Sequence, residues 1–272
     1  MKKNKLQSNA GVSILEVLIA LFITSIITVA VLRLYVTQHQ NYMIQDDITD
    51  IQQNARASID ELGRQIRLAG YDLPLGLEGI IAYDTDPDTI IIQYKDGNCD
   101  TYLSAPMPQP SAELKCGSDV SCFYDGQWIF IYDADSAQGE WFVITEVQEA
   151  ALHIQHNTMS LSRKYDANAL LLALTRVKYY IDNTTDPDHP KLMIQPMGKD
   201  PMVYAENISD LQFNYVMKNG SIEAEPVLTE NIREVMIDVT AHSNQPERDN
   251  NGEEHFRNRS FSTSVYLRNI GI

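Results

Sequence analysis

Positive charge is scarce in this sequence. Its 272 residues include 21 lysines and arginines against 37 aspartates and glutamates, which gives a formal net charge of -16. Proteins bind nucleic acid largely by neutralising its phosphates with basic side chains, so we do not expect a general nucleic-acid-binding function. The same balance argues against attachment to an anionic membrane surface by charge alone. Lys2, Lys3 and Lys5 are an exception, because they stand together ahead of an apolar segment with no acidic residue among them.

Motifs of common catalytic sites are also missing. The sequence has no HExxH, no GxxxxGK[ST], no GxSxG and no GxGxxG. We therefore expect no enzyme activity and no catalytic residue. Two acidic turns, 133–140 and 249–254, hold oxygen ligands of the type that calcium prefers, but neither has the spacing of an EF-hand. We expect both turns to be solvated and the protein to hold no metal or cofactor, with calcium as the alternative.

Cysteine is rare, with Cys99, Cys116 and Cys122 alone. The three do not form a CxxC pair, and no histidine pair stands near them at zinc-finger spacing. If the region after the apolar segment is exported, two of the three can form a disulfide. Cys116 and Cys122 are closest in the sequence and are the pair that we expect. Cys99 with Cys116 is an alternative, and three free thiols are another.

Proline is missing from Met1 to Leu73, which permits a long uninterrupted helix. Residues 12–32 read VSILEVLIALFITSIITVAVL, with Glu16 as the only charged residue. As a helix, this stretch is long enough to cross the bilayer core of about 30 Å. No A-x-A-like cleavage site follows it, so we expect it to be retained rather than removed as an ordinary secretory signal. We predict a membrane-spanning helix over 12–36.

Apolar residues at helical spacing extend this helix. They form one stripe, consisting of Ile44, Ile48, Ile51, Ala55, Ile59, Leu62 and Ile66. Gly70 is a candidate C-cap, and Pro74 prevents simple continuation of the helix. We predict an amphipathic continuation over 37–70 whose stripe packs on a sheet of the same chain. A coiled-coil partner is the alternative.

Strand-like alternation of apolar and polar residues dominates the region 71–272. The expected strands are 90–94, 128–132, 141–147, 152–156, 177–181, 211–215, 235–239 and 261–267. Residues 97–126 are poor in such runs and contain Pro106, Pro108 and Pro110, so we expect an inserted loop there. The predicted fold class is α+β, a long N-terminal α-helix packed against a mostly antiparallel β-sheet body. One domain and two lobes both remain open for this body.

Glu16 is an unusual residue for a membrane-spanning segment. A carboxylate in a membrane segment costs about 2–3 kcal/mol, so it should have a partner or a function unless it lies near the interface. The lysine-rich leader, the sequence Gly11-Val12-Ser13-Ile14-Leu15-Glu16 and the following apolar run resemble the signal of type IV prepilins. The resemblance implies that a prepilin peptidase removes residues 1–11 by cutting between Gly11 and Val12. It further implies methylation of the Val12 amine and pairing of Glu16 with the amine of a neighbouring subunit. Val12 departs from the phenylalanine that is usual at this position.

Residues 51–74 narrow the resemblance to PilW-type minor pilins. The matching residues are Gln53, Asn54, Arg56, Ile66, Arg67, Ala69, Gly70 and Tyr71. The order of strand-like segments after Pro74 is also similar to that of the PilW proteins and of J-type minor pseudopilins of type II secretion, in pattern only.

A pilin-like fold is what this resemblance implies, in a minor pilin that primes type IV pilus assembly or lies near the pilus tip. The implied partners are other minor pilins, the major pilin and an inner-membrane assembly platform. The implied location is the inner membrane, with the body in the periplasm, and then the pilus or pseudopilus. One alternative is a minor pseudopilin of type II secretion. Another is a membrane-anchored adhesion or binding protein that never joins a filament.

Overall fold

One long apolar N-terminal helix and a body of mostly antiparallel sheets make this an α+β protein. The computed structural model describes residues 12–248 and 251–270. The chain divides into a first unit, Met1–Thr49, and a second unit, Asp50–Ile272. Helix α1 (Ile14–Leu68) contributes residues to both. Its predicted extent is confirmed to within two residues at each end.

Two sheets form most of the second unit. The larger sheet contains β1 (Ile80–Tyr83), β2 (Thr89–Tyr102), β4 (Trp128–Asp133), β5 (Gln138–Val143), β8 (Leu170–Asp182), β9 (Lys191–Pro196) and β10 (Met202–Glu206). Its order is β1-β2-β8-β4-β5, with β9 also beside β8 and β10 beside β9. The smaller sheet contains β11 (Ile208–Met217), β12 (Ile222–Glu223), β13 (Ile232–His242) and β16 (Asn258–Tyr266). Its order is β12-β11-β13-β16. All of these pairs are antiparallel.

Short elements complete the fold. Strands β3 (Leu114–Lys115), β6 (Glu146–Gln148) and β7 (His153–Gln155) form a small sheet, and β14 (Glu247–Arg248) pairs with β15 (Glu254–His255). Two 3-10 turns, η1 (Glu149–Ala151) and η2 (Thr229–Asn231), precede β7 and β13.

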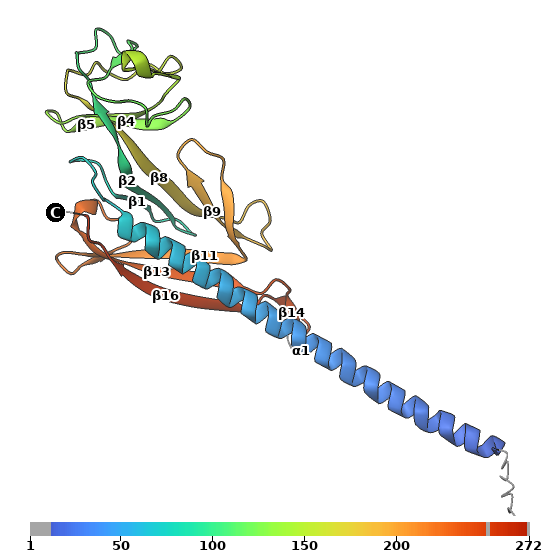
Figure 1. The fold of residues 1–272 in the computed structure, drawn as a ribbon. Coiled ribbons are helices and arrows are strands. Elements are labelled where there is room, and N and C mark those ends of the chain that lie inside the picture. The colour runs from blue at the N-terminus through green and yellow to red at the C-terminus, as the bar shows by residue number, and fades with distance from the viewer. Residues whose placement is uncertain (1–11, 249–250, 271–272) are drawn as a thin grey trace, which may run out of the picture. The chain divides into compact units, whose positions relative to one another are not determined.

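The part of α1 that belongs to the second unit packs on both sheets (Figure 1). Its buried residues are Ile51, Ala55, Ser58, Leu62, Gly63, Gln65 and Ile66. The four apolar ones, Ile51, Ala55, Leu62 and Ile66, share one hydrophobic core with side chains of β1, β2, β8 and β9 and with side chains of β11, β13 and β16. From Ile51 onward, the predicted apolar stripe is therefore confirmed as an intramolecular packing face. Burial of apolar area on this face stabilises the second unit by roughly 25 cal/mol per Å².

A second hydrophobic core lies where β2 and β8 extend beyond α1 (Figure 1). It contains Leu103, Leu114, Phe123, Phe142 and Leu171, all of them buried. The region 97–126, expected to be an inserted loop, is mostly irregular but includes the end of β2, all of β3 and several of these buried side chains. The second unit is thus one unit by its contacts, with two main cores that share two long strands.

Candidate functional site

The start of α1 holds the residues that the prepilin-like signal singles out. Glu16 lies in the first turn, and its Oε2 accepts a hydrogen bond from the Ser13 backbone N–H at 2.9 Å. The Ser13 hydroxyl in turn accepts one from the Leu15 backbone N–H at 3.3 Å. This reciprocal arrangement is a capping box, which satisfies backbone donors and places negative charge at the positive end of the helix dipole. The Ser-x-x-Glu spacing is readable in the sequence, so this role of Glu16 was predictable there.

The expected cleavage site lies at the boundary of the described residues. Val12 is described and its side chain is 73% exposed, whereas Gly11 lies outside the described residues. The capping box leaves Oε1 of Glu16 with no hydrogen bond among the residues that the structure describes. One oxygen of this carboxylate therefore caps the N-terminus of its own helix, and the other remains free to accept a hydrogen bond from a further donor.

Apolar side chains cover the N-terminal part of α1, up to residue 36. Large hydrophobic side chains are exposed all along residues 12–36, with Phe22 at 68% and Leu34 at 61%. The helix is long and apolar enough to cross a membrane, since its most apolar window has a mean hydropathy of 2.6 and no buried residue. Apolar surface of this extent is stable in lipid or against other helices rather than in water.

Hydroxyl groups inside this apolar segment are satisfied by the helix itself. Thr24 donates to the Ala20 carbonyl at 2.7 Å, Ser25 to the Phe22 carbonyl at 2.7 Å, and Thr28 to the Thr24 carbonyl at 2.8 Å. Such bonds matter in hydrocarbon, where no water replaces a missing acceptor. The three hydroxyls are therefore compatible with a lipid environment, and Glu16 remains the one charged side chain of residues 12–32.

Glu61 joins α1 to the larger sheet through its carboxylate. Its Oε1 accepts hydrogen bonds from the Tyr179 hydroxyl and the Gln65 amide, both at 3.0 Å, and its Oε2 accepts one from Arg64 at 2.6 Å. Burial acts to raise the pKa of Glu61, but the hydrogen bonds from Arg64, Gln65 and Tyr179 outweigh it and leave the pKa below its ordinary value. Burial, with the nearby Glu61, raises the pKa of Tyr179.

The C-terminal end of α1 is closed by contacts from distant segments. The Gly70 N–H donates to the Gln93 carbonyl at 2.9 Å, and the Asn269 amide donates to the Arg67 carbonyl at 3.0 Å. Gly70 has a φ of +79°, and a Cβ there would lie 2.6 Å from Ile270. Only glycine fits both the left-handed conformation and the space, so the predicted C-cap is confirmed.

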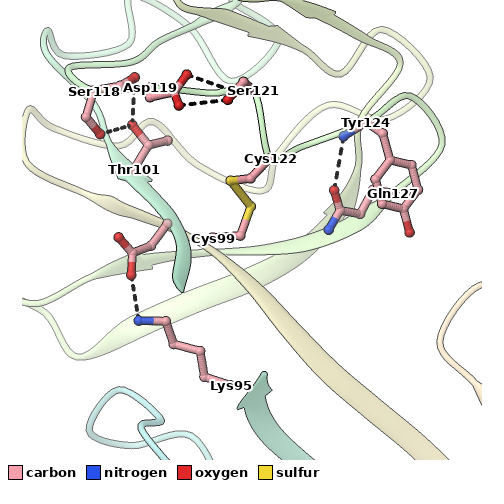
Figure 2. Close-up of a disulfide and its surroundings, with 10 residues drawn as sticks. Lys95, Cys99, Thr101, Ser118, Asp119, Ser121, Cys122, Tyr124 and Gln127 are labelled. Atoms are coloured by element: carbon pink, nitrogen blue, oxygen red, sulfur yellow. Dashed lines mark hydrogen bonds and ion pairs between the residues drawn. A yellow bond between two sulfur atoms is a disulfide. The ribbon is translucent and has the colours of Figure 1, made fainter. Parts of the chain in front are cut away.

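The structure corrects the expected cysteine pairing. Cys99 and Cys122 form the disulfide, with Cα atoms 5.7 Å apart (Figure 2). Cys116 is a buried free thiol. The expected Cys116–Cys122 pair and the Cys99–Cys116 alternative are therefore both wrong. Cys116 forms a β-bridge with Leu103, and its N–H donates to the Leu152 carbonyl at 2.7 Å, so its side chain packs in the second core. Disulfides require converging side chains, and short sequence separation does not provide them.

In the acidic turn 133–140, Asp133 and Glu140 accept hydrogen bonds from donors of the protein itself. Asp133 accepts a hydrogen bond from the Ser136 hydroxyl at 2.7 Å, and Glu140 accepts bonds from the Ser162 N–H and hydroxyl. Within the described part of the chain, no three His, Cys, Asp or Glu side chains are grouped so that they could hold a metal ion. Residues 249–250 of the second turn lie outside that part.

Comparisons of this chain with protein-family models and with curated proteins found no match. The structure brings Val12, Ser13 and Glu16 together at the start of an exposed apolar helix.

Proposed function

We propose that this protein is a minor pilin, made as a prepilin and assembled into a type IV pilus in a priming or tip-proximal role. The observation that carries the proposal is the start of α1, where an exposed apolar helix has one carboxylate in its first turn, five residues after Gly11. In this proposal the helix first anchors the protein in the inner membrane with the body in the periplasm. It then becomes part of the filament core.

Glu16 sets the register between subunits in this mechanism. Cleavage between Gly11 and Val12 creates a cationic amine, and methylation leaves its charge in place. A cation is unfavourable at the N-terminus of a helix, because the helix dipole is positive there. The open Oε1 of Glu16 in a neighbouring subunit offers the compensating charge, and an ion pair in low dielectric selects one geometry better than it adds net stability.

Exchange of lipid for protein contacts drives assembly. Lipid tails are as apolar as leucine, so the helices gain packing and lose little by leaving the bilayer. The hydroxyls of Thr24, Ser25 and Thr28 already bond to their own helix, so they need no new partner in a filament core.

The deciding experiment is the intact mass of the protein from membranes of strains with and without the prepilin peptidase. Loss of residues 1–11 and gain of one methyl group, only where the peptidase is present, is the expected result. An identical uncut mass in both strains would refute the proposal and favour an anchored binding protein that never joins a filament.

Glu16→Ala tests the assembly step separately, with Thr28→Ala as a control in the same apolar segment. We expect the Glu16 variant to be cleaved and anchored but missing from sheared filaments, and the control to be incorporated. Normal incorporation of both variants would contradict the role of Glu16. A deletion that abolishes protein secretion but leaves surface pili intact would instead assign the chain to a type II secretion pseudopilus.

A further inference from the structure

The larger sheet carries a pair of polar side chains on the face opposite α1. Gln93 of β2 and Arg176 of β8 are register partners, so their side chains lie side by side on one face. Their neighbours Ile92 and Val177 point the other way, into the core beneath α1. This face of the sheet plays no part in the proposed assembly through the N-terminal helix.

Arg176 has no counter-charge among the residues that the structure describes. Its side chain is half-buried, and within residues 12–248 and 251–270 its guanidinium makes no ion pair or hydrogen bond. The guanidinium carbon lies 5.9 Å from the centroid of the Trp141 ring. Burial lowers the pKa of Arg176, because the charged form is desolvated without compensation. In a chain with 37 acidic residues, an unpaired and partly buried arginine is a costly arrangement that a bound anion would relieve.

Gln93 presents an unmet acceptor next to this arginine. The side chain is 1% exposed, and its amide nitrogen donates to the Glu78 carbonyl at 2.7 Å. Its Oε1 is buried and has no hydrogen-bond partner. A buried acceptor without a donor costs about 1–3 kcal/mol, and a small shift of this side chain toward the groove lets a ligand hydroxyl supply the missing bond.

Both side chains line a cavity of about 500 Å³, together with the rings of Tyr132 and Trp141. Two further hollows of about 260 Å³ each share Arg176 with it, and one of them is lined by Tyr124 and Trp128. The two acidic residues of the main cavity do not neutralise Arg176. Glu140 is held by the Ser162 N–H and hydroxyl and by the Tyr165 hydroxyl. Glu78 is exposed to solvent, and its backbone carbonyl is the acceptor for the Gln93 amide.

We propose that this groove binds an acidic oligosaccharide, with a uronic-acid residue seated at Arg176. The guanidinium forms a two-pronged contact with the sugar carboxylate. A ring hydroxyl donates to Gln93 Oε1, and the apolar face of the sugar lies on Trp141. The row of hollows past Arg176 accommodates neighbouring sugar units against Trp128 and Tyr124. Sugar hydroxyls both donate and accept, as the glutamine amides of the groove require. The flat apolar face of a sugar ring also suits the aromatic rings that line the groove.

Tryptophan fluorescence tests this directly, because both tryptophans of the chain, Trp128 and Trp141, line the groove. The full chain in detergent micelles is titrated with a galacturonic acid trisaccharide and, in parallel, with the neutral galactose trisaccharide, and calorimetry measures the same binding. We expect saturable binding of the acidic sugar only. Arg176→Gln should weaken the affinity for the acidic sugar by about tenfold or more. Arg176→Lys should weaken it by less, because lysine keeps the positive charge but cannot form the two-pronged contact with a carboxylate.

Arg56→Gln is the matched control, since it removes the same charge from an exposed position on α1 and should leave affinity unchanged. Thermal unfolding of each variant shows that the fold is kept. Absence of binding by both methods, equal binding of the neutral sugar, or equal loss in the Arg56 and Arg176 variants would overturn the proposal. Tighter binding of a peptide with a free C-terminal carboxylate would overturn the choice of a saccharide.

Discussion

Glu61 and Asp88 are both largely screened from water, yet their pKa values shift in opposite directions. Glu61 accepts hydrogen bonds from three side chains, one of them a cationic arginine, and its pKa falls. Asp88 is 2% exposed, and burial raises its pKa although the N–H groups of Phe213 and Thr85 bond to it. The partners, rather than burial alone, decide whether each charge stabilises the fold at neutral pH.

Glu61→Gln should make the free energy of unfolding less dependent on pH between pH 7 and pH 3. The folded-state pKa of Glu61 lies below its ordinary value of 4.5, so its stabilisation is present above that pH and is lost as pH falls through the folded value. We expect the variant to be about 1–2 kcal/mol less stable at pH 7 and the difference to shrink below pH 4.5. Urea unfolding between pH 7 and pH 3 measures it. Asp60→Asn, at the exposed neighbouring position, should change little, and a pH-independent difference for Glu61 would contradict the assignment.

The Cys99–Cys122 disulfide has a sequence separation of 23, and restricting the unfolded chain over such a loop is worth about 3 kcal/mol. Replacing both cysteines with serine should lower the free energy of unfolding by about that amount. Cys116→Ala should cost about 1 kcal/mol, because it removes a buried sulfur but no cross-link.

Peptide mapping without reduction provides the independent check. It should recover one cross-linked peptide pair that contains Cys99 and Cys122, with Cys116 alkylated only after unfolding. Burial raises the pKa of the Cys116 thiol to about 11, so slow reaction of the folded protein is expected. A linked peptide that contains Cys116 would contradict the structure.

At the scale of elements, Asp88 connects the two sheets. Its backbone N–H donates to the Leu211 carbonyl of β11 at 2.8 Å, and its Oδ2 accepts from the Phe213 N–H at 2.7 Å. Its Oδ1 accepts from the Thr85 N–H at 3.0 Å, which closes the turn between β1 and β2. One side chain thus fixes a turn of the larger sheet against a central strand of the smaller one.

Asp88→Asn should loosen this connection. Asparagine keeps one acceptor but points an amide group at an N–H, so two buried donors face each other and the variant should lose about 1–3 kcal/mol. Chemical denaturation at pH 7 measures the loss. Asp84→Asn, an exposed carboxylate of the same turn, is the control, and equal effects of both changes would show that Asp88 acts only through its charge.

Local patterns predicted the elements better than their pairing. The helical stripe and Gly70 identified the packing face and end of α1, and alternation located β4, β8, β11 and β13, because both signals depend on residues close in sequence. The expected strand 141–147 is divided between β5 and β6, and the short β1 and β10 were not predicted.

Contacts between residues far apart in the sequence determine the features that local patterns did not predict. The free thiol of Cys116 follows from its bridge to Leu103, and the Gln93–Arg176 pair exists only because β2 lies beside β8. The Glu61–Tyr179 bond likewise joins residues 118 positions apart. No spacing in the sequence reports such contacts, so neither the disulfide nor the polar groove could be derived from it.

At the scale of the whole molecule, the boundary between the units falls inside α1. Among the described residues, the buried hydrophobic side chains begin at Ile51, directly after the start of the second unit at Asp50. The predicted division at 36 and 70 follows hydropathy, whereas the packed core includes the last turns of the helix from Ile51 onward. The second unit should therefore fold by itself only if it keeps those turns.

Two truncated chains test this. A fragment of residues 50–272 keeps every buried hydrophobic side chain that the structure describes and should be soluble, with a single cooperative unfolding transition. A fragment of residues 71–272 loses Ile51, Leu62 and Ile66, and each such large side chain is worth about 2–5 kcal/mol in a core. Their sum approaches the whole stability of a domain, about 5–15 kcal/mol, so this fragment should aggregate or stay unfolded. Circular dichroism and sedimentation distinguish the two, and equal unfolding midpoints would mean that α1 is not part of the core.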